Sequence, residues 1–231
     1  SNMANNSVKI WENGSIFAAL TGLTSQSKNK KTGDMLGISI LPIEEKPPDS
    51  IKHKDDGPQC GTCALAASTP GPWSCYVNPI ALNAVWTATI KQKVSKLVEK
   101  FLELTPTPIR LGTYGDPALL PLELLKKLVS GRKYTGYTHQ WKTCSPEYSQ
   151  YLMASIDHSN NKADAIKKGY RTYRILSELD TLDEDEIMCP HDSTGVQCCD
   201  CRLCSGNGVK AKNIADRVSG PKNKVSQYGS K

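Results

Sequence analysis

The chain has 231 residues, of which 38% are hydrophobic and 23% are charged, and its formal net charge is +6. These values indicate a globular protein with one sizeable core, and they exclude a disordered chain and a membrane protein. No apolar run reaches the roughly 20 residues that a membrane-spanning helix needs, and the first residues lack a signal-peptide pattern. We therefore expect a cytoplasmic protein with no membrane partner.

The amino-terminal part of the chain contains little predicted structure before its first buried strand. Residues 1–34 form a polar segment, in which we expect one short strand or turn and little more. The apolar run Leu36–Leu41, closed by Pro42, predicts a buried strand. An α/β domain is therefore expected over residues 35–188.

A first group of cysteines follows this strand, after a proline-rich and charged connection. Cys60, Cys63 and Cys75 have the spacing of metal ligands, but three thiolates are an incomplete set. Either the open position belongs to a substrate or cofactor, or a distant residue completes a structural zinc knuckle. The candidates for that residue are His53, Cys144 and Cys189.

Helices and strands alternate in the middle of the chain. Asn78 is placed to cap a helix that begins at Pro79, and apolar residues at three- and four-residue spacing extend this amphipathic helix to Leu102. Such alternation predicts an α/β fold with a parallel sheet, either open or closed into a partial (β/α) barrel. The other expected elements are strands over 109–114, 134–141, 151–157 and 170–175, and helices over 121–130 and 162–168.

Polar side chains follow the predicted strands at their carboxyl ends, where parallel sheets bind ligands. Asp116, His139 and Asp157 are the candidate catalytic residues, because carboxylates and imidazoles at that edge can orient a substrate or move protons. Each has an ordinary alternative role. Asp116 precedes Pro117 and is a good helix cap, His139 fits the edge of a core, and Asp157 fits the start of a turn.

The second group of cysteines is the strongest signal in the sequence. Five of the nine cysteines lie within sixteen residues, from Cys189 to Cys204. Cys198, Cys201 and Cys204 repeat at every third position, and Cys189 stands apart in a Cys-Pro pair, which favours a 4Fe–4S cluster over zinc. Disulfides are the alternative, but an odd number of cysteines at metal-ligand spacing fits a reducing compartment better. We expect both cysteine groups to face the same end of the sheet.

The carboxyl-terminal end of the chain is basic. We divide it into a cysteine-rich metal-binding segment, residues 189–206, and a basic and flexible tail, residues 207–231. From Ser205 onward, six lysines and arginines accompany a single acidic residue, Asp216. Such a tail is either a solvated end or a contact with a nucleic acid.

Several motifs resemble an uncharacterised family encoded by bacteriophages and plasmids. The resemblance covers most of residues 32–206 and names no activity. If the chain is encoded by a phage, its place is the cytoplasm of the host. The motifs are Thr113–Ala118, Tyr134–Trp141, Met153–Asp157, Gly169–Arg174 and the Cys-Pro pair followed by C-x2-C-x2-C.

A broader likeness is to the radical SAM superfamily, whose partial barrel carries a three-cysteine loop after its first strand. The likeness implies that Cys60, Cys63 and Cys75 hold a cluster with one iron open to S-adenosylmethionine, and that the later cysteines hold an auxiliary centre. It further implies cofactor contacts from Tyr76, beside the last cysteine, and from Gly112 and Gly115 at a strand end. The spacing here departs from the C-x3-C-x2-C of that superfamily.

A weaker likeness is to tRNA-guanine transglycosylases, barrels whose zinc site reads C-x-C-x2-C. Cys199, Cys201 and Cys204 satisfy that spacing, but the zinc histidine of the family has no counterpart downstream.

Three functions are therefore expected. The first is an iron–sulfur, radical SAM-like enzyme that modifies a nucleic acid or nucleotide. The second is a zinc-dependent, transglycosylase-like enzyme acting on DNA, with Asp116 or Asp157 as nucleophile or base. The third is a non-enzymatic nucleic-acid-binding module that zinc stabilises.

Overall fold

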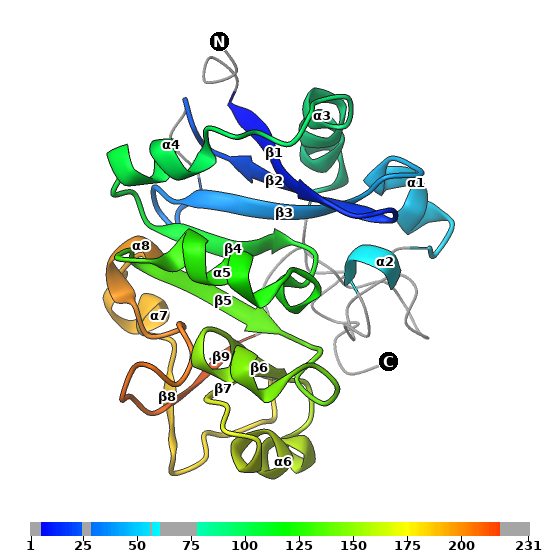
Figure 1. The fold of residues 1–231 in the computed structure, drawn as a ribbon. Coiled ribbons are helices and arrows are strands. Elements are labelled where there is room, and N and C mark those ends of the chain that lie inside the picture. Colours follow the sequence, from blue (N-terminus) through cyan, green and yellow to red (C-terminus); the bar gives the residue numbers. More distant parts are fainter. Residues whose placement is uncertain (1–5, 25–28, 56, 61–77, 218–231) are drawn as a thin grey trace.

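The computed structural model describes residues 6–24, 29–55, 57–60 and 78–217. Within these residues, nine strands form one open sheet in the order β1-β2-β3-β4-β5-β6-β7-β9-β8 (Figure 1). All neighbours from β3 to β8 pair in parallel, and β2 runs antiparallel to both of its neighbours. The strands are β1 (Ser7–Glu12), β2 (Ile16–Thr21), β3 (Leu36–Pro42), β4 (Ile109–Tyr114), β5 (Tyr134–Thr138), β6 (Met153–Ile156), β7 (Thr172–Leu176), β8 (Glu186–Met188) and β9 (Asn213–Arg217).

The open parallel sheet is one of the two predicted arrangements, and the strand order does not close into a barrel. The five predicted strands are present as β3 to β7. β3 and β6 are buried along their whole length, whereas buried and half-buried residues are mixed in β4, β5 and β7. The helices are α1 (Pro47–Lys52), α2 (Gly57–Cys60), α3 (Pro79–Thr89), α4 (Val98–Leu104), α5 (Leu122–Val129), α6 (Lys162–Lys167), α7 (Pro190–Thr194) and α8 (Cys198–Cys201).

The amino-terminal segment contains more structure than its polar composition predicts. Strands β1 and β2 form a hairpin, and Phe17 and Leu20 are fully buried. Asn13 organises the turn, since its side-chain oxygen accepts hydrogen bonds from the backbone N–H groups of Ser15 and Ile16 at 2.8 and 2.9 Å. The two apolar runs on either side of this turn are short, but together they complete one end of the core.

The single helix expected from residue 78 to 102 is wrong, because the chain forms two helices there. The predicted cap is confirmed, since Asn78 Oδ1 accepts from the backbone N–H of Ile80 at 2.9 Å. The helix ends at Thr89 because the chain then runs along the edge of β1. The side chain of Gln92 accepts from the backbone N–H of Lys9 at 3.0 Å, and the backbone N–H of Ser95 donates to the Lys9 carbonyl at 2.9 Å. These bonds satisfy an open sheet edge and outweigh the helical pattern.

The segment predicted to be a flexible tail begins with a buried strand. β9 lies between β7 and β8, and its Ile214 and Ala215 have no exposed surface. Residues 207–217 are therefore part of the fold, while residues 218–231 lie outside the described part of the chain. Only two apolar residues in five mark this strand, which is why the sequence pattern did not reveal it.

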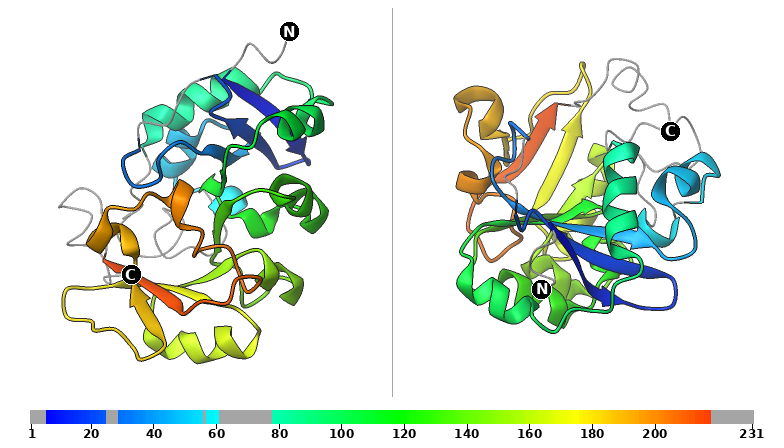
Figure 2. Two further views of the ribbon diagram at one scale, coloured as in Figure 1. Left: turned by 90° about the vertical axis from the view of Figure 1, so that its left-hand side faces the viewer. Right: turned by 90° about the horizontal axis from the view of Figure 1, so that it is seen from above.

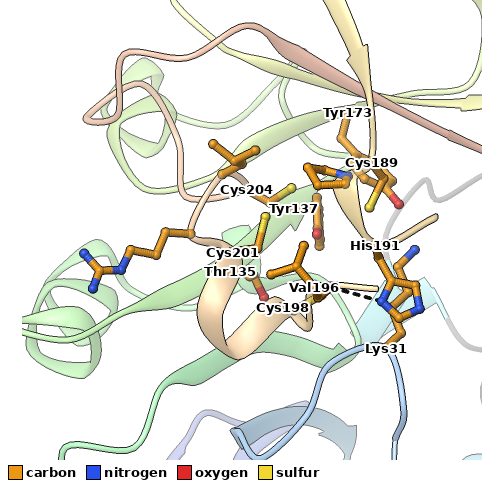
Figure 3. Close-up of a pocket in the computed structure, with 13 residues that line it drawn as sticks. Lys31, Thr135, Tyr137, Tyr173, Cys189, His191, Val196, Cys198, Cys201 and Cys204 are labelled. Atoms are coloured by element: carbon orange, nitrogen blue, oxygen red, sulfur yellow. Dashed lines mark hydrogen bonds between the residues drawn. The ribbon is translucent and has the colours of Figure 1, made fainter. Parts of the chain in front are cut away.

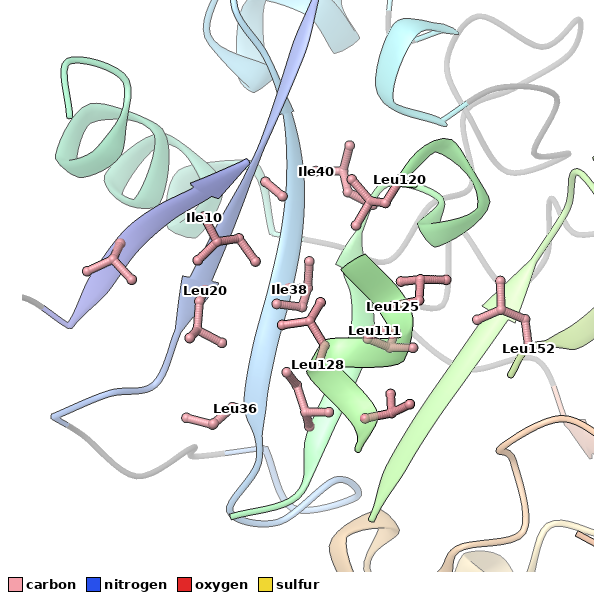
Figure 4. Packing of buried hydrophobic residues seen from close by; sticks show 14 of the residues in the cluster. Ile10, Leu20, Leu36, Ile38, Ile40, Leu111, Leu120, Leu125, Leu128 and Leu152 are labelled. Atoms are coloured by element: carbon pink, nitrogen blue, oxygen red, sulfur yellow. The ribbon is translucent and has the colours of Figure 1, made fainter. Parts of the chain in front are cut away.

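Different elements cover the two faces of the sheet. On one face, Leu125 and Leu128 of α5 lie against Ile38 of β3 and Leu111 of β4 (Figure 4). On the other face, β3 and β4 contribute to a cluster with α1 and α3. Further along that second face, Met153 and Ile214 contact the cysteine-rich segment. Two further views show α7 and α8, in orange, gathered at one side of the sheet (Figure 2).

Candidate metal centre

Four cysteines of the predicted metal-binding segment line a single pocket (Figure 3). They are Cys189, which follows β8, Cys198 and Cys201, which begin and end α8, and Cys204, which lies three residues further on. The pocket lies between this segment and the face of the sheet opposite α5. The four cysteines that the spacing predicts as ligands therefore lie along one pocket. The side chains that reach it from the sheet and from the preceding loop are Lys31, Thr135, Tyr137 and Tyr173.

Two reversals of the backbone bring the four cysteines back to the same place. The backbone N–H of Cys189 donates to the Ala215 carbonyl at 2.7 Å, which fixes the start of the segment on β9. α7 ends at Gly195, whose φ of +72° is the left-handed conformation that glycine adopts without strain. α8 ends at Arg202, whose φ of +63° is unusual for a residue with a side chain. This second reversal returns Cys204 to the sheet.

Residues 30–32 form a strap that holds α8 in place. The backbone N–H groups of Cys198 and Cys199 donate to the carbonyls of Lys31 and Thr32, both at 2.9 Å. The side chain of Cys199 lies on the strap side rather than in the pocket, since a Cβ atom placed on Gly33 would lie 2.5 Å from Cys199 Sγ. The pocket therefore takes the C-x2-C-x2-C set, and the C-x-C-x2-C set that begins at Cys199 is not gathered.

The loop around Cys204 pairs with the part of β5 that does not pair with β6. β5 pairs with β4 through its first three residues and with β6 through its last two. In the first part of β5, the backbone N–H of Gly136 donates to the Cys204 carbonyl at 3.0 Å, and the Tyr134 hydroxyl donates to the Ser205 carbonyl at 2.7 Å. These two hydrogen bonds join the loop that carries Cys204 to β5 in the core of the fold.

A buried arginine fixes the other side of this loop. Arg171 is only 8% exposed, and its guanidinium donates to four backbone carbonyls. Two of them flank Cys204 and two precede β9. Arg171 therefore holds the returning chain in place, and burial lowers the pKa of its guanidinium. The accepting carbonyls are Leu203 at 2.6 Å, Lys212 at 2.8 Å, and Gly206 and Ala211 at 3.1 Å.

The surroundings of the thiols oppose their ionisation unless a cation is bound. Burial raises the pKa of Cys204 to about 12, and the neighbouring cysteines contribute to the increase. Burial also raises the pKa of Cys189 and Cys198, although the positive charge of Lys31 opposes it at both. A metal ion reverses this balance, because thiols that bind a metal lose their protons.

The spacing of the four cysteine side chains can be compared with the spacing that a single metal ion requires. Four sulfurs around one zinc lie about 3.8 Å apart, since zinc–sulfur bonds are about 2.3 Å long. Among the described residues, no three His, Cys, Asp or Glu side chains come close enough together to hold one metal ion. The four cysteines therefore line one pocket without gathering around a single point.

A polar network at the rim of the pocket was not predicted. The Lys31 ammonium forms an ion pair with Asp216, and the Tyr173 hydroxyl donates to the same carboxylate oxygen at 2.7 Å. Burial raises the pKa of Asp216, but its hydrogen bonds with Lys31 and Tyr173 outweigh this and lower it overall. No sequence motif marks these residues, because Lys31 and Asp216 are 185 positions apart.

The first cysteine group lies elsewhere. Cys60 ends α2, and the preceding residue, Gln59, accepts a hydrogen bond from the backbone N–H of Asp116 at 2.9 Å, just beyond the carboxyl end of β4. α7 and α8 lie on the opposite side of the view in Figure 1. The expectation that both groups face one end of the sheet is therefore wrong as far as Cys60 is concerned. Cys63, Cys75 and Tyr76 lie outside the described residues.

The three candidates for a fourth ligand to that group have separate environments. His53 Nδ1 lies 3.2 Å from a carboxylate oxygen of Glu45 on the surface. Cys144 Sγ lies 3.1 Å from the Tyr170 hydroxyl. Cys189 lines the pocket with the second group.

The candidate catalytic residues do not line the cysteine pocket. Asp116 is buried and uses both carboxylate oxygens, one to accept from the backbone N–H of Ala118 at 2.9 Å and one from that of His139 at 2.8 Å. These bonds support the capping alternative and join the ends of β4 and β5. The side chains of His139 and Asp157 are half-buried near the ends of β5 and β6.

The two glycines with a predicted cofactor contact have structural reasons to be glycine. Gly112 and Gly115 have φ of +73° and +79°. A Cβ atom on Gly115 would lie 2.7 Å from the Ile40 side chain and 2.8 Å from the Gln59 carbonyl. The close contact of β4 with β3 and α2 therefore accounts for this position.

Comparison with family models, with curated proteins and with solved structures found no match to the chain. Of the helices in the described residues, none is long and apolar enough to cross a membrane. The fold and the arrangement of the four cysteines are therefore the observations on which a function can be based.

Proposed function

We propose that this protein is an iron–sulfur protein that binds one 4Fe–4S cluster through Cys189, Cys198, Cys201 and Cys204. The observation that carries the proposal is that these four cysteines, and not the adjacent Cys199, line one pocket. Their C-x2-C-x2-C spacing and the separate Cys-Pro pair are those of ferredoxin-type ligands.

The lining of the pocket and the spread of its thiols favour a cluster over a single ion. The four thiols do not converge on one point, yet their charges interact, as expected for ligands spread around a larger group. Leu203 and the rings of Tyr137 and Tyr173 pack around Cys189 and Cys204, which limits access of water to the bound sulfurs. A bound cluster supplies one-electron transfer, and the chain supplies its ligands, hydrogen bonds and partial burial.

The wider role of the protein stays a prediction. In it, Cys60, Cys63 and Cys75 hold a second cluster that binds S-adenosylmethionine, and the substrate is a nucleic acid or nucleotide. The four-cysteine centre would then be the auxiliary centre of a radical SAM-like enzyme.

The cluster assignment is tested on the full chain, purified and reconstituted with iron and sulfide without oxygen. We expect about four irons and four sulfides bound in this pocket, with visible thiolate-to-iron absorption that bleaches on reduction. Cys201→Ser should lose this iron, and the matched variant Cys199→Ser should retain it. The variant Cys60→Ser reports separately on iron bound at the first group.

Two results would overturn the assignment. One is a protein that binds a single zinc and no iron. The other is equal loss of iron in Cys201→Ser and Cys199→Ser, which would mean that the pocket does not select its ligands as the structure implies.

A structural zinc site is the second candidate, and the short helices of the segment favour it. α7 and α8 have five and four residues, too few to be stable alone, and a tetrahedral zinc would join them to the sheet. This candidate predicts one zinc per chain, and it predicts that a chelator unfolds residues 189–206.

A further inference from the structure

Two side chains act on the sulfurs of the pocket from opposite directions. From the sheet, Tyr137 packs against Cys204, and both side chains line the pocket. The Tyr137 ring lies on the Tyr173 ring, with centroids 4.6 Å apart and planes inclined by 54°. Figure 3 shows Tyr137 between Cys204 and Tyr173, at the inner wall of the pocket. This packing fixes the direction in which the hydroxyl points.

From the strap, Lys31 brings a positive charge to the pocket. Its side chain lines the pocket together with Cys189 and Cys198. Asp216 holds this ammonium in position, and the Tyr173 hydroxyl holds Asp216. The two tyrosines, the aspartate and the lysine therefore connect the inner wall of the pocket to its rim.

Resting on the cluster assignment above, we propose that Tyr137 and Lys31 raise the reduction potential of the centre. Tyr137 does so by donating a hydrogen bond to Cys204 Sγ, and Lys31 by placing a positive charge beside Cys189 and Cys198.

The direction follows from the charge change on reduction. An added electron makes the cluster and its four thiolates more negative, and no bond is formed or broken. A hydrogen-bond donor and a cation both stabilise the more negative state, and in a partly buried site their effect is weakly screened. Both residues therefore favour the reduced form and leave the set of ligands unchanged.

The experiment measures the midpoint potential of the reconstituted full-length protein by redox titration followed by electron paramagnetic resonance. Tyr137→Phe and Lys31→Met should each lower the midpoint potential by ~59 mV. For a one-electron couple at a fixed potential, this shift makes the ratio of reduced to oxidised cluster about tenfold smaller. Asp216→Asn removes a negative charge and should shift the potential upward. Lys31→Arg should retain the wild-type value, because it keeps the positive charge.

Two matched controls separate tuning from loss of structure. Tyr134→Phe removes a hydroxyl from the same strand that binds the Ser205 carbonyl rather than a sulfur. Lys30→Met removes the exposed neighbouring charge on the strap. Both should leave the potential unchanged.

The outcomes distinguish this proposal from the cluster assignment. A wild-type protein that takes up no cluster refutes the assignment and the proposal together. A protein that takes up the cluster, and whose potential is the same in Tyr137→Phe and Lys31→Met, refutes the tuning alone. If Tyr137→Phe does not fold, the opposite shifts expected for Lys31→Met and Asp216→Asn decide the question.

Discussion

The contact between the strap and α8 can be tested with a pair of glycines that share one backbone conformation. Gly33 and Gly195 both have φ of +72°. A Cβ atom on Gly33 would lie 2.5 Å from Cys199 Sγ and 2.7 Å from Gln197 Oε1, whereas a Cβ atom on Gly195 would have no neighbour within 4 Å. Alanine at Gly195 thus measures the conformational cost alone, and alanine at Gly33 measures that cost plus the close contact.

The magnitudes follow from these two terms. A left-handed alanine costs about 1–2 kcal/mol, and the reduced freedom of the unfolded chain returns about 0.4–1 kcal/mol. Gly195→Ala should therefore lower the free energy of unfolding by about 1 kcal/mol. Overpacking at a close contact adds about 1–3 kcal/mol, and the lower half of this range applies because the new Cβ meets the ends of two side chains that can turn away. Gly33→Ala should therefore lower the free energy of unfolding by about 2–3 kcal/mol.

Urea unfolding of the purified full-length variants measures both losses, and a double variant identifies their source. Cys199→Ala shortens the side chain that Gly33→Ala meets, so in the Cys199→Ala background the loss caused by Gly33→Ala should shrink by about 1 kcal/mol or more. Equal losses for Gly33→Ala and Gly195→Ala would show that the strap does not lie against α8 as described.

Three further predictions follow from buried polar groups. Arg171→Met leaves four carbonyls without their donor and should lower the free energy of unfolding by about 3 kcal/mol in urea, while Arg171→Lys recovers only part; a loss under about 1 kcal/mol would contradict the role of Arg171. Asp116→Ala should lower the free energy of thermal unfolding by about 1–2 kcal/mol, whereas Asp116→Asn keeps a capping oxygen and should lower it less. Equal losses in the two variants would contradict the capping role. Burial alone would raise the pKa of Glu186, but the hydrogen bonds and positive charge of Arg174 have the larger effect, and the pKa is lowered overall. The pair therefore stabilises the fold above the ordinary glutamate pKa, and this stabilisation is lost as the pH falls through the lowered pKa of the folded state. Stability measured against pH should show this acid loss in the wild type and not in Arg174→Gln, and identical pH profiles would count against it.

The predictable part of the fold consists of strands whose own residues are apolar. β3 to β7 each contain a run of β-branched, aromatic or leucine residues between turn signals, and such runs bury themselves in a parallel sheet wherever the chain places them. β8 and β9 have only three and five residues, and their burial depends on pairing with each other and with β7. No local pattern marks strands of that kind.

The candidate site also combines residues that a local sequence pattern reveals with residues that only tertiary contacts bring to it. The proposed ligands Cys198, Cys201 and Cys204 are close in sequence, so their spacing alone marks them as candidates. Lys31 reaches the pocket through tertiary contacts, and Tyr137 reaches it through the register of β5, neither of which the sequence displays. Asp116 shows the opposite case, because a carboxylate at a strand end satisfied the pattern of a catalytic residue while the structure uses it to bind backbone N–H groups.

The most direct test of the central claim is anomalous X-ray scattering from crystals of the anaerobically reconstituted full-length protein, recorded at the iron and zinc absorption edges. We expect iron density in the pocket, bonded to the sulfurs of Cys189, Cys198, Cys201 and Cys204 and not to that of Cys199. Zinc density between the four sulfurs, or disulfides that join them in pairs, would contradict it.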